Sequence, residues 1–105
     1  MQVVHLLSRS HPEFIEEGNV RIERVVLGDG LVLWPERDQA AAGYIFRAHI
    51  ESSGFTIEAH PMKFGKTGLF SYFRDSTGTL RFEMDGRRAT AQSRPVGSPA
   101  AGKEP

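Results

Sequence analysis

The sequence predicts an α+β fold, rich in strands, in which a four-stranded antiparallel meander over residues 43–84 is covered by the N-terminal half. Two observations lead to this prediction. Apolar and polar residues alternate through four consecutive segments, and the N-terminal half combines a helix-capping motif with an Asp-Gly turn. With 105 residues, the chain is long enough for one core. We expect one domain over residues 1–85 and a tail over 86–105.

The N-terminal half is predicted to begin with a strand and a short helix. A short apolar run indicates a strand over residues 3–7. Ser10 and Glu13 then have the spacing of a capping box, which favours a helix that buries Phe14 and ends at Gly18. We expect this helix to pack on the meander.

Residues 20–34 predict a hairpin that turns on Asp29 and Gly30. Asp-Gly accepts the positive φ angles of a type I′ turn, and apolar runs flank it on both sides. Residues 35–43 begin with a proline and end with a glycine, which indicates two helical turns. These segments complete the predicted cover of the meander.

The first hairpin of the meander has a well-defined register. Apolar side chains alternate with polar ones through residues 44–60, on both sides of a Ser-Ser turn. A turn of two residues keeps the apolar faces of both strands on the same side. This register places Phe46 opposite Ala59 and Arg47 opposite Glu58, so an apolar pair and a charged pair agree.

The second hairpin, over residues 68–84, has two registers that the sequence leaves open. A type I turn closed by a glycine bulge at Gly78 places Tyr72 opposite Phe82 on the covered face and Phe73 on the other face. A register without the bulge turns Phe73 inward and Tyr72 outward. We take the bulged register as the prediction.

The C-terminal segment, residues 86–105, has one large apolar residue, Val96, and is rich in Pro, Gly, Ala and Ser. Such a segment buries too little apolar surface to offset the entropy lost on ordering. We therefore predict a flexible tail, whose removal lowers the melting temperature by a few degrees at most.

The composition excludes several classes of function. Thirteen basic residues balance thirteen acidic ones, and no segment is apolar and long enough to span a membrane, so we expect neither a nucleic acid nor a membrane as partner. Cysteine is absent, which excludes disulfides and Cys-ligated zinc. The N-terminus lacks a secretory apolar segment, so we expect a cytoplasmic protein as the sequence stands.

One stretch, Lys-Phe-Gly-Lys-Thr-Gly, is similar to the end of a phosphate-binding loop. That motif requires a glycine where His60 stands, and a helix where a strand is predicted to follow. We therefore interpret the stretch as a turn between the hairpins, with an anion site built on its lysines and turn amides as an alternative. The candidate binding residues are Lys63, Phe64, Gly65, Lys66, Thr67 and Gly68.

No group of residues has the pattern of a catalytic or metal site. His49 and His60 face the same side of the first hairpin, but their register separates them by about 13 Å at roughly 3.3 Å per residue. No Gly-x-Ser-x-Gly stretch follows an apolar strand. We expect no enzyme activity, no cofactor and no metal.

Residues 43–95, about half of the chain, resemble the C-terminal globular region of bacterial type IV pilin-like and pseudopilin-like proteins. The matching positions are Gly43, Tyr44, Phe46, Ala59, Pro61, Gly65, Thr67, Gly68, Ser71, Tyr72, Phe73, Asp75, Thr77, Gly78, Leu80, Arg81, Ala89, Thr90, Ala91 and Pro95. The resemblance implies a non-enzymatic subunit with an antiparallel sheet. It also implies an extracytoplasmic location if a prepilin-type leader precedes the chain.

These observations favour a non-catalytic structural or interaction module, resembling the sheet domain of pilin-like proteins, with a protein partner or self-association. The alternative is a soluble cytosolic binding domain for a protein partner or a small anionic ligand, bound through the 61–68 loop. An enzyme without a recognisable motif ranks below both.

Overall fold

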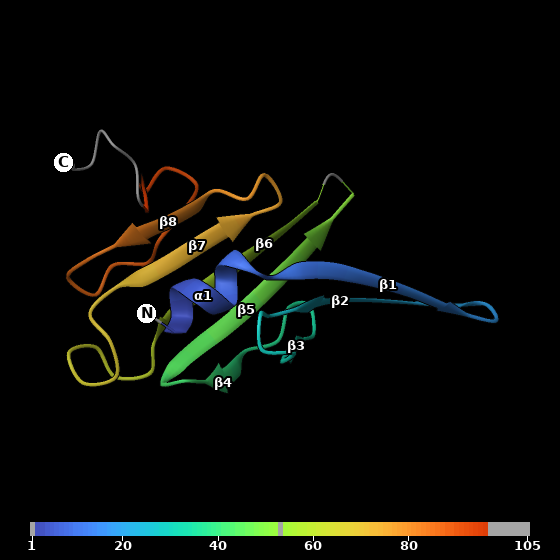
Figure 1. The fold of residues 1–105 in the computed structure, drawn as a ribbon, viewed down its shortest axis with the longest axis horizontal. Helices are drawn as coiled ribbons and strands as arrows, with labels where there is room; N and C mark the ends of the chain where they lie inside the picture. The colour runs from blue at the N-terminus through green and yellow to red at the C-terminus, as the bar shows by residue number, and fades with distance from the viewer. Residues whose placement is uncertain (1, 53, 97–105) are drawn as a thin grey trace.

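A computed structural model describes residues 2–52 and 54–96. Nine strands in these residues form two antiparallel sheets, with one short helix (Figure 1). The small sheet has the order β1-β2-β3, and the large sheet has the order β4-β5-β6-β7-β8-β9. The predicted α+β class is therefore wrong: apart from one helix of seven residues, the regular structure of the described residues is all strand, and six strands form the meander instead of four.

The predicted N-terminal strand is a helix, α1 (Gln2–Ser8). Val3, Leu6 and Leu7 are all buried, and their i, i+3, i+4 spacing places them on one helix face. The hydroxyl of Ser10 donates a hydrogen bond to the carbonyl of Leu7 at 2.6 Å. Ser10 therefore follows the end of this helix and does not begin a second one. No helix in the described residues is long and apolar enough to cross a membrane.

The helix predicted over residues 10–17 is a strand. β1 (His11–Glu17) pairs antiparallel with β2 (Val20–Val26) along the full length of both. Between them, Gly18 has a φ of 61°, whereas Asn19 does not have a positive φ. This is the type II′ arrangement, with glycine at the first central position, whose twist matches that of a hairpin. The glycine predicted to end a helix instead turns a ribbon.

The hairpin predicted at Asp29 and Gly30 is present and leads into β3 (Val32–Leu33), but its turn is not of type I′, because Asp29 does not have a positive φ. The amide of Leu27 donates to the carbonyl of Leu31 at 2.8 Å, and Gly30 has a φ of 92°. β3 pairs with the last two residues of β2. The small sheet therefore has a third strand only next to the body of the molecule.

Residues 35–43 do not form the two predicted helical turns. β4 (Gln39–Ala41) pairs with β5 (Tyr44–Glu51) and forms one edge of the large sheet. Before β4, the amide of Glu36 donates to the carbonyl of Ala48 at 2.8 Å, which ties this segment to β5. Backbone pairing with the sheet thus replaces the local bonds of a helix.

β5 pairs with β6 (Gly54–Pro61) in the predicted register. Phe46 stands opposite Ala59 and Arg47 opposite Glu58, which confirms both predicted pairs. Phe46 and Ala59 are buried, whereas Arg47 is exposed on the other face. The alternation of apolar residues was thus a sufficient guide to this hairpin.

β7 (Ser71–Asp75) and β8 (Leu80–Glu83) form the second hairpin in the glycine-bulge register. Tyr72 stands opposite Phe82 and is buried, whereas Phe73 lies on the opposite face and is partly exposed. The turn glycine has a φ of 91°, as the bulge requires. The bulged register is therefore confirmed.

The large sheet continues where the tail was predicted to begin. β9 (Arg94–Pro95) pairs with β8, and Ala89 and Ser93 are buried before it. The prediction of a flexible tail is therefore wrong for residues 86–96, which pack against the sheet. The remainder of the predicted tail, 97–105, lies outside the described residues.

One core lies between the large sheet, α1 and the small sheet. α1 lies across the face of the large sheet, beside the base of the β1–β2 ribbon (Figure 1). The largest fully buried side chains are Tyr44, Phe46, Leu6, Leu7, Leu27, Leu33, Ile57 and Val25. The opposite side of the large sheet, which we call the outer face, carries Arg47, Glu58 and Phe73 and is open to solvent.

Candidate functional site

The residues that the sequence singles out, 63–68, lie in the loop that joins β6 to β7, here the 62–70 loop. Hydrogen bonds hold this loop together. The amides of Lys66 and Thr67 both donate to the carbonyl of Lys63 at 3.0 Å. The amide of Lys63 in turn donates to the Thr67 hydroxyl at 3.0 Å. Thr67 thus fixes the start of the loop to its end.

The loop is also packed against the sheet through a glycine. A Cβ placed on Gly68 would lie 2.2 Å from the hydroxyl oxygen of Tyr44, so no other residue fits there without displacing that ring. Tyr44 donates to the carbonyl of Phe70 at 2.8 Å. Burial raises the pKa of Tyr44, which keeps this hydroxyl a donor. The amide of Gly65 donates to the carbonyl of Gly68 at 2.9 Å.

This geometry is not that of a phosphate-binding loop. The amides of Lys63, Gly65, Lys66 and Thr67 all donate within the loop, so they are not free to bind an anion. β7 follows the loop, where a phosphate site requires the N-terminus of a helix. The stretch is the turn that the sequence predicts.

The loop exposes large apolar side chains although its backbone is fixed. The exposed fractions are 53% for Met62, 53% for Phe64 and 58% for Leu69. The turn after β8 adds Met84, which is also exposed, and brings Gly86 against Phe64. Single exposed apolar residues are common, but a set gathered on one loop indicates a contact surface.

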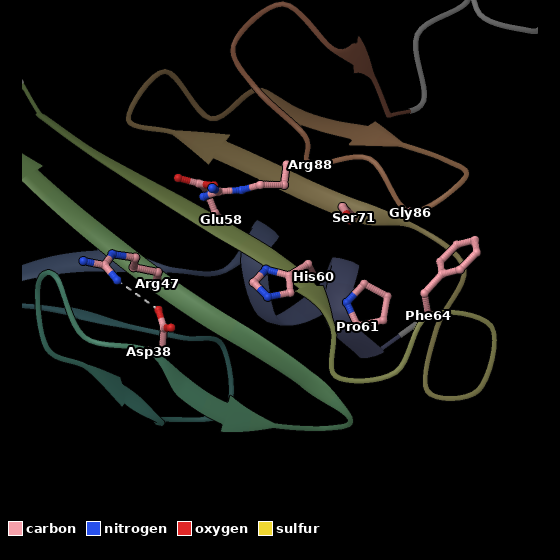
Figure 2. A pocket seen from close by; sticks show the side chains of 9 residues that line it. All are labelled: Asp38, Arg47, Glu58, His60, Pro61, Phe64, Ser71, Gly86 and Arg88. Carbon is pink, nitrogen blue, oxygen red and sulfur yellow. Dashed lines mark hydrogen bonds and ion pairs between the residues drawn. The ribbon is translucent and has the colours of Figure 1, made fainter.

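A groove of about 480 Å³ opens on the outer face beside Phe64 (Figure 2). It lies over β5, β6 and β7, and the segment after β8 closes one side (Figure 2). Its lining consists of Asp38, Arg47, Glu58, His60, Pro61, Phe64, Ser71, Gly86 and Arg88.

The charges of the groove compensate one another. Arg88 forms an ion pair with Glu58, and Arg47 bonds to Asp38 at 3.2 Å. Arg47 also lies 3.5 Å from Glu36, just outside the groove. Two guanidinium groups therefore face two carboxylates across the lining, and neither guanidinium is left without a partner for an anion.

His60 and Ser71 lie side by side near the middle of the groove (Figure 2). Ser71 is only 4% exposed. In the described residues neither side chain forms a hydrogen bond, and none joins the two. The pair therefore lacks the contact by which a base activates a serine. Both are available to bond to a polar group of a ligand.

A metal site is not formed in residues 2–52 and 54–96, where no group of three or more His, Asp or Glu side chains gathers. The imidazole of His49 instead lies between two carboxylates, those of Glu36 and Glu51. His60 lies elsewhere on the outer face, in the groove.

Sequence reasoning found the loop but missed most of the groove. Its cross-strand pair, Arg47 and Glu58, was predicted from the register of the first hairpin. Arg88 was assigned to a tail, and nothing local to it indicates an ion pair with a residue thirty positions earlier. Ser71 and His60 are brought together by the pairing of β6 with β7, which the sequence does not place in register.

Comparison with protein-family models, with curated proteins and with solved structures finds no match for this chain. The resemblance to pilin-like proteins therefore stays a prediction.

Proposed function

We propose that this chain is a protein-interaction module, which binds a partner protein through the 62–70 loop and the adjoining groove. The observation that supports this function is the exposure of Met62, Phe64 and Leu69 on a loop fixed by its own hydrogen bonds. A loop that is already ordered loses little conformational entropy on binding, and its apolar side chains gain by leaving water.

The groove adds the polar part of such a contact. Protein interfaces commonly place an apolar or aromatic anchor within a rim of polar groups. Phe64 stands at the end of the groove as the anchor, and His60 and Ser71 offer hydrogen bonds that nothing in the described residues takes up. We therefore propose that the groove takes part in recognition of the partner.

A protein partner is favoured over a small anion. The amides of Lys63, Gly65, Lys66 and Thr67 donate within the loop, and Arg47 and Arg88 already pair with carboxylates. Of the predicted anion ligands, this leaves the exposed ammonium groups of Lys63 and Lys66, without the amides that would complete an anion site. Exposed apolar side chains, in contrast, contribute little to the binding of a small anion and much to a protein interface.

Photo-crosslinking tests this function in the cells that make the protein. Benzoylphenylalanine in place of Phe64 is expected to yield a specific crosslinked protein. The same residue at Thr77, in the turn between β7 and β8 at the opposite end of the sheet, is expected not to capture it. The absence of a crosslink at position 64 contradicts the proposal.

The captured partner then allows a direct measurement of affinity. Phe64→Ala is expected to raise its Kd at least about tenfold, as removal of an interface anchor does. Trp34, with an exposed fraction of 40% and outside both the loop and the groove, provides the control: Trp34→Ala is expected to leave this Kd unchanged. Equal effects of the two changes rule out the 62–70 loop as the contact.

A further inference from the structure

A second surface lies at the other end of the molecule from the 62–70 loop. β1 and β2 continue beyond the rest of the fold as a two-stranded ribbon (Figure 1). β3 pairs only with Val25 and Val26, so within the described residues 13–24 are paired with one another alone. We call residues 13–24 the arm.

The arm has little to stabilise it from within. An isolated two-stranded hairpin is only marginally stable in water, because neither face is covered and both edges are open. Phe14 and Val20 are 51% and 61% exposed, and the cross-strand pair Ile15 and Ile22 is only partly buried. The arm thus presents apolar side chains that the rest of the chain does not cover.

Among the described residues β1 is the edge strand of the small sheet, and a hollow of about 380 Å³ separates its Pro12 and Phe14 from the end of the β5–β6 hairpin at Phe55. Glu17 and Val20 flank the two-residue turn, and in such a turn the flanking residues bond to each other across the ribbon. The alternation of the strand then directs the backbone N–H and C=O of Phe14 and Glu16 to the open edge. Pro12, which has no N–H, occupies the next outward position, where proline breaks no bond within the ribbon.

The arm and its base are acidic. Residues 11–26 contain four glutamates and two arginines, which leaves two negative charges. Both arginines are engaged within the ribbon: Arg24 lies 2.8 Å from Glu13, and Arg21 lies 3.5 Å from Glu23. On the part of β2 that does not pair with β3, the charge of Arg21 is therefore balanced by that of Glu23.

The open edge of β1 carries the uncompensated charge. Glu16 and Glu17 form no ion pair within the described part of the chain, and both stand near the tip on the edge strand. A strand added along β1 would meet Phe14 and Glu16 on one face of the ribbon and Glu17 on the other. The Phe14 ring is 51% exposed and has the Arg21 guanidinium 4.9 Å from its centroid. The edge thus combines free backbone groups, an apolar contact and a negative charge.

We propose that the arm binds an extended, basic segment of a partner protein, which adds to β1 as a further antiparallel strand. Lysine or arginine side chains of that segment lie beside Glu16 and Glu17, and an apolar side chain packs on Phe14. Charge complementarity selects this occupant over a second copy of the chain, because pairing β1 with itself gathers six glutamates in two adjacent strands.

Synthetic peptides test the proposal on the full chain. The probe is acetyl-KKVVKVK-amide, which in an antiparallel register places lysines opposite Glu17 and Glu16 and a valine opposite Phe14. Its binding is followed by the chemical shifts of backbone amides, and we expect saturable shifts at Phe14 and Glu16 and none at Lys66. The proline-containing acetyl-KKVPKVK-amide has the same charge but cannot complete a ladder, and is expected to bind at least about tenfold more weakly. Acetyl-EEVVEVE-amide is expected not to bind.

Two substitutions with equal change in net charge separate local from global electrostatics. Glu16→Gln is expected to raise the Kd of the lysine peptide about two- to fivefold, the effect of one exposed ion pair. Asp29→Asn, in the turn before β3, is expected to leave it unchanged. The proposal is overturned by equal effects of both changes, by equal binding of the proline peptide, or by shifts outside the arm. Dimerisation of the chain through the arm likewise overturns it.

Discussion

The glycine at position 68, which makes the loop resemble a phosphate-binding motif, is explained by its packing against Tyr44. The ring of Tyr44 occupies the space that any side chain at position 68 would need. Gly68→Ala is therefore expected to lower the free energy of unfolding by about 1–3 kcal/mol, as overpacking does. Urea denaturation measures this loss.

Gly65 provides the control within the same loop. It has a φ of 85°, but nothing lies within 4 Å of a Cβ placed there. Gly65→Ala therefore meets conformational strain alone, which costs roughly 1 kcal/mol. If Gly68→Ala proves no more damaging than Gly65→Ala, the loop is not held against Tyr44 in solution.

His49 is the residue whose titration the structure predicts most directly. Its hydrogen bond to Glu36 raises the pKa of the imidazole above 6.5, and the charges of Glu36 and Glu51 act in the same direction. The same bond lowers the pKa of Glu36 below 4.5. NMR titration of the His49 ring is expected to show the raised pKa, and Glu36→Gln is expected to return it toward 6.5.

The sign of the effect on stability follows from these directions. The contribution of His49 is complete below pH 6.5 and is lost as pH rises through its raised pKa. The contribution of Glu36 is complete above pH 4.5 and is lost as pH falls through its lowered pKa. The difference in melting temperature between the natural protein and His49→Gln is expected to be largest between these values. A difference that does not vary with pH contradicts the ion pair.

At the scale of single elements, the sequence pattern predicts the β5 and β6 strands clearly but is ambiguous in the N-terminal segment. Alternation over eight residues in each strand determined the β5–β6 register, because a slip of one residue would expose the whole apolar face. The apolar run over 3–7 is too short to distinguish a strand from a helix by periodicity. Two motifs gave opposite predictions for residues 11–17. The capping box at Ser10 predicts a helix, whereas Gly18-Asn19 is a common two-residue hairpin turn and predicts a strand. The structure has the hairpin.

The segment after β8 belongs to the sheet because Ser93 holds it there. The Ser93 hydroxyl donates to Glu83 at 3.0 Å and accepts from the amide of Thr90 at 2.9 Å. Ser93→Ala leaves two partly buried groups without a partner and is expected to cost about 1–3 kcal/mol in urea denaturation. The exposed Ser8 is the control, since Ser8→Ala is expected to change stability by about 0.5 kcal/mol or less. Equal effects would show that the segment is not docked.

The composition of residues 86–96 predicts a flexible tail, and there is a physical reason why this prediction is wrong for the segment. Its stabilising contacts are a buried Ala89, polar side-chain bonds and backbone pairing with β8, none of which requires large apolar residues. A chain that ends at Asp85 is now expected to melt well below the full chain, by more than the few degrees that the composition predicts. A smaller loss would restore the interpretation as a tail.

At the scale of the whole molecule, one core joins the two sheets. Val25 and Leu33 of the small sheet belong to the same buried cluster as Phe46 of the large sheet and Leu6 of α1. The sequence shows that each of these residues is apolar and suited to a core. It does not show which apolar faces pack together, because that depends on contacts between segments far apart in the chain. The separate hairpins were therefore predictable, and the docking of one sheet on the other was not.

Hydrogen exchange distinguishes this shared core from the arm. Amides of β5 and β6 lie in interior strands of the large sheet and are expected to exchange only by global unfolding, whereas amides of the arm exchange by local opening. Phe46→Ala removes a fully buried side chain and is expected to cost about 3–5 kcal/mol of the roughly 5–15 kcal/mol available. It should reduce protection at Ala59 by that amount and leave the exchange of Phe14 unchanged. Should Phe14 prove as protected as Ala59, the arm folds as part of the body and its edge is not an open surface in solution.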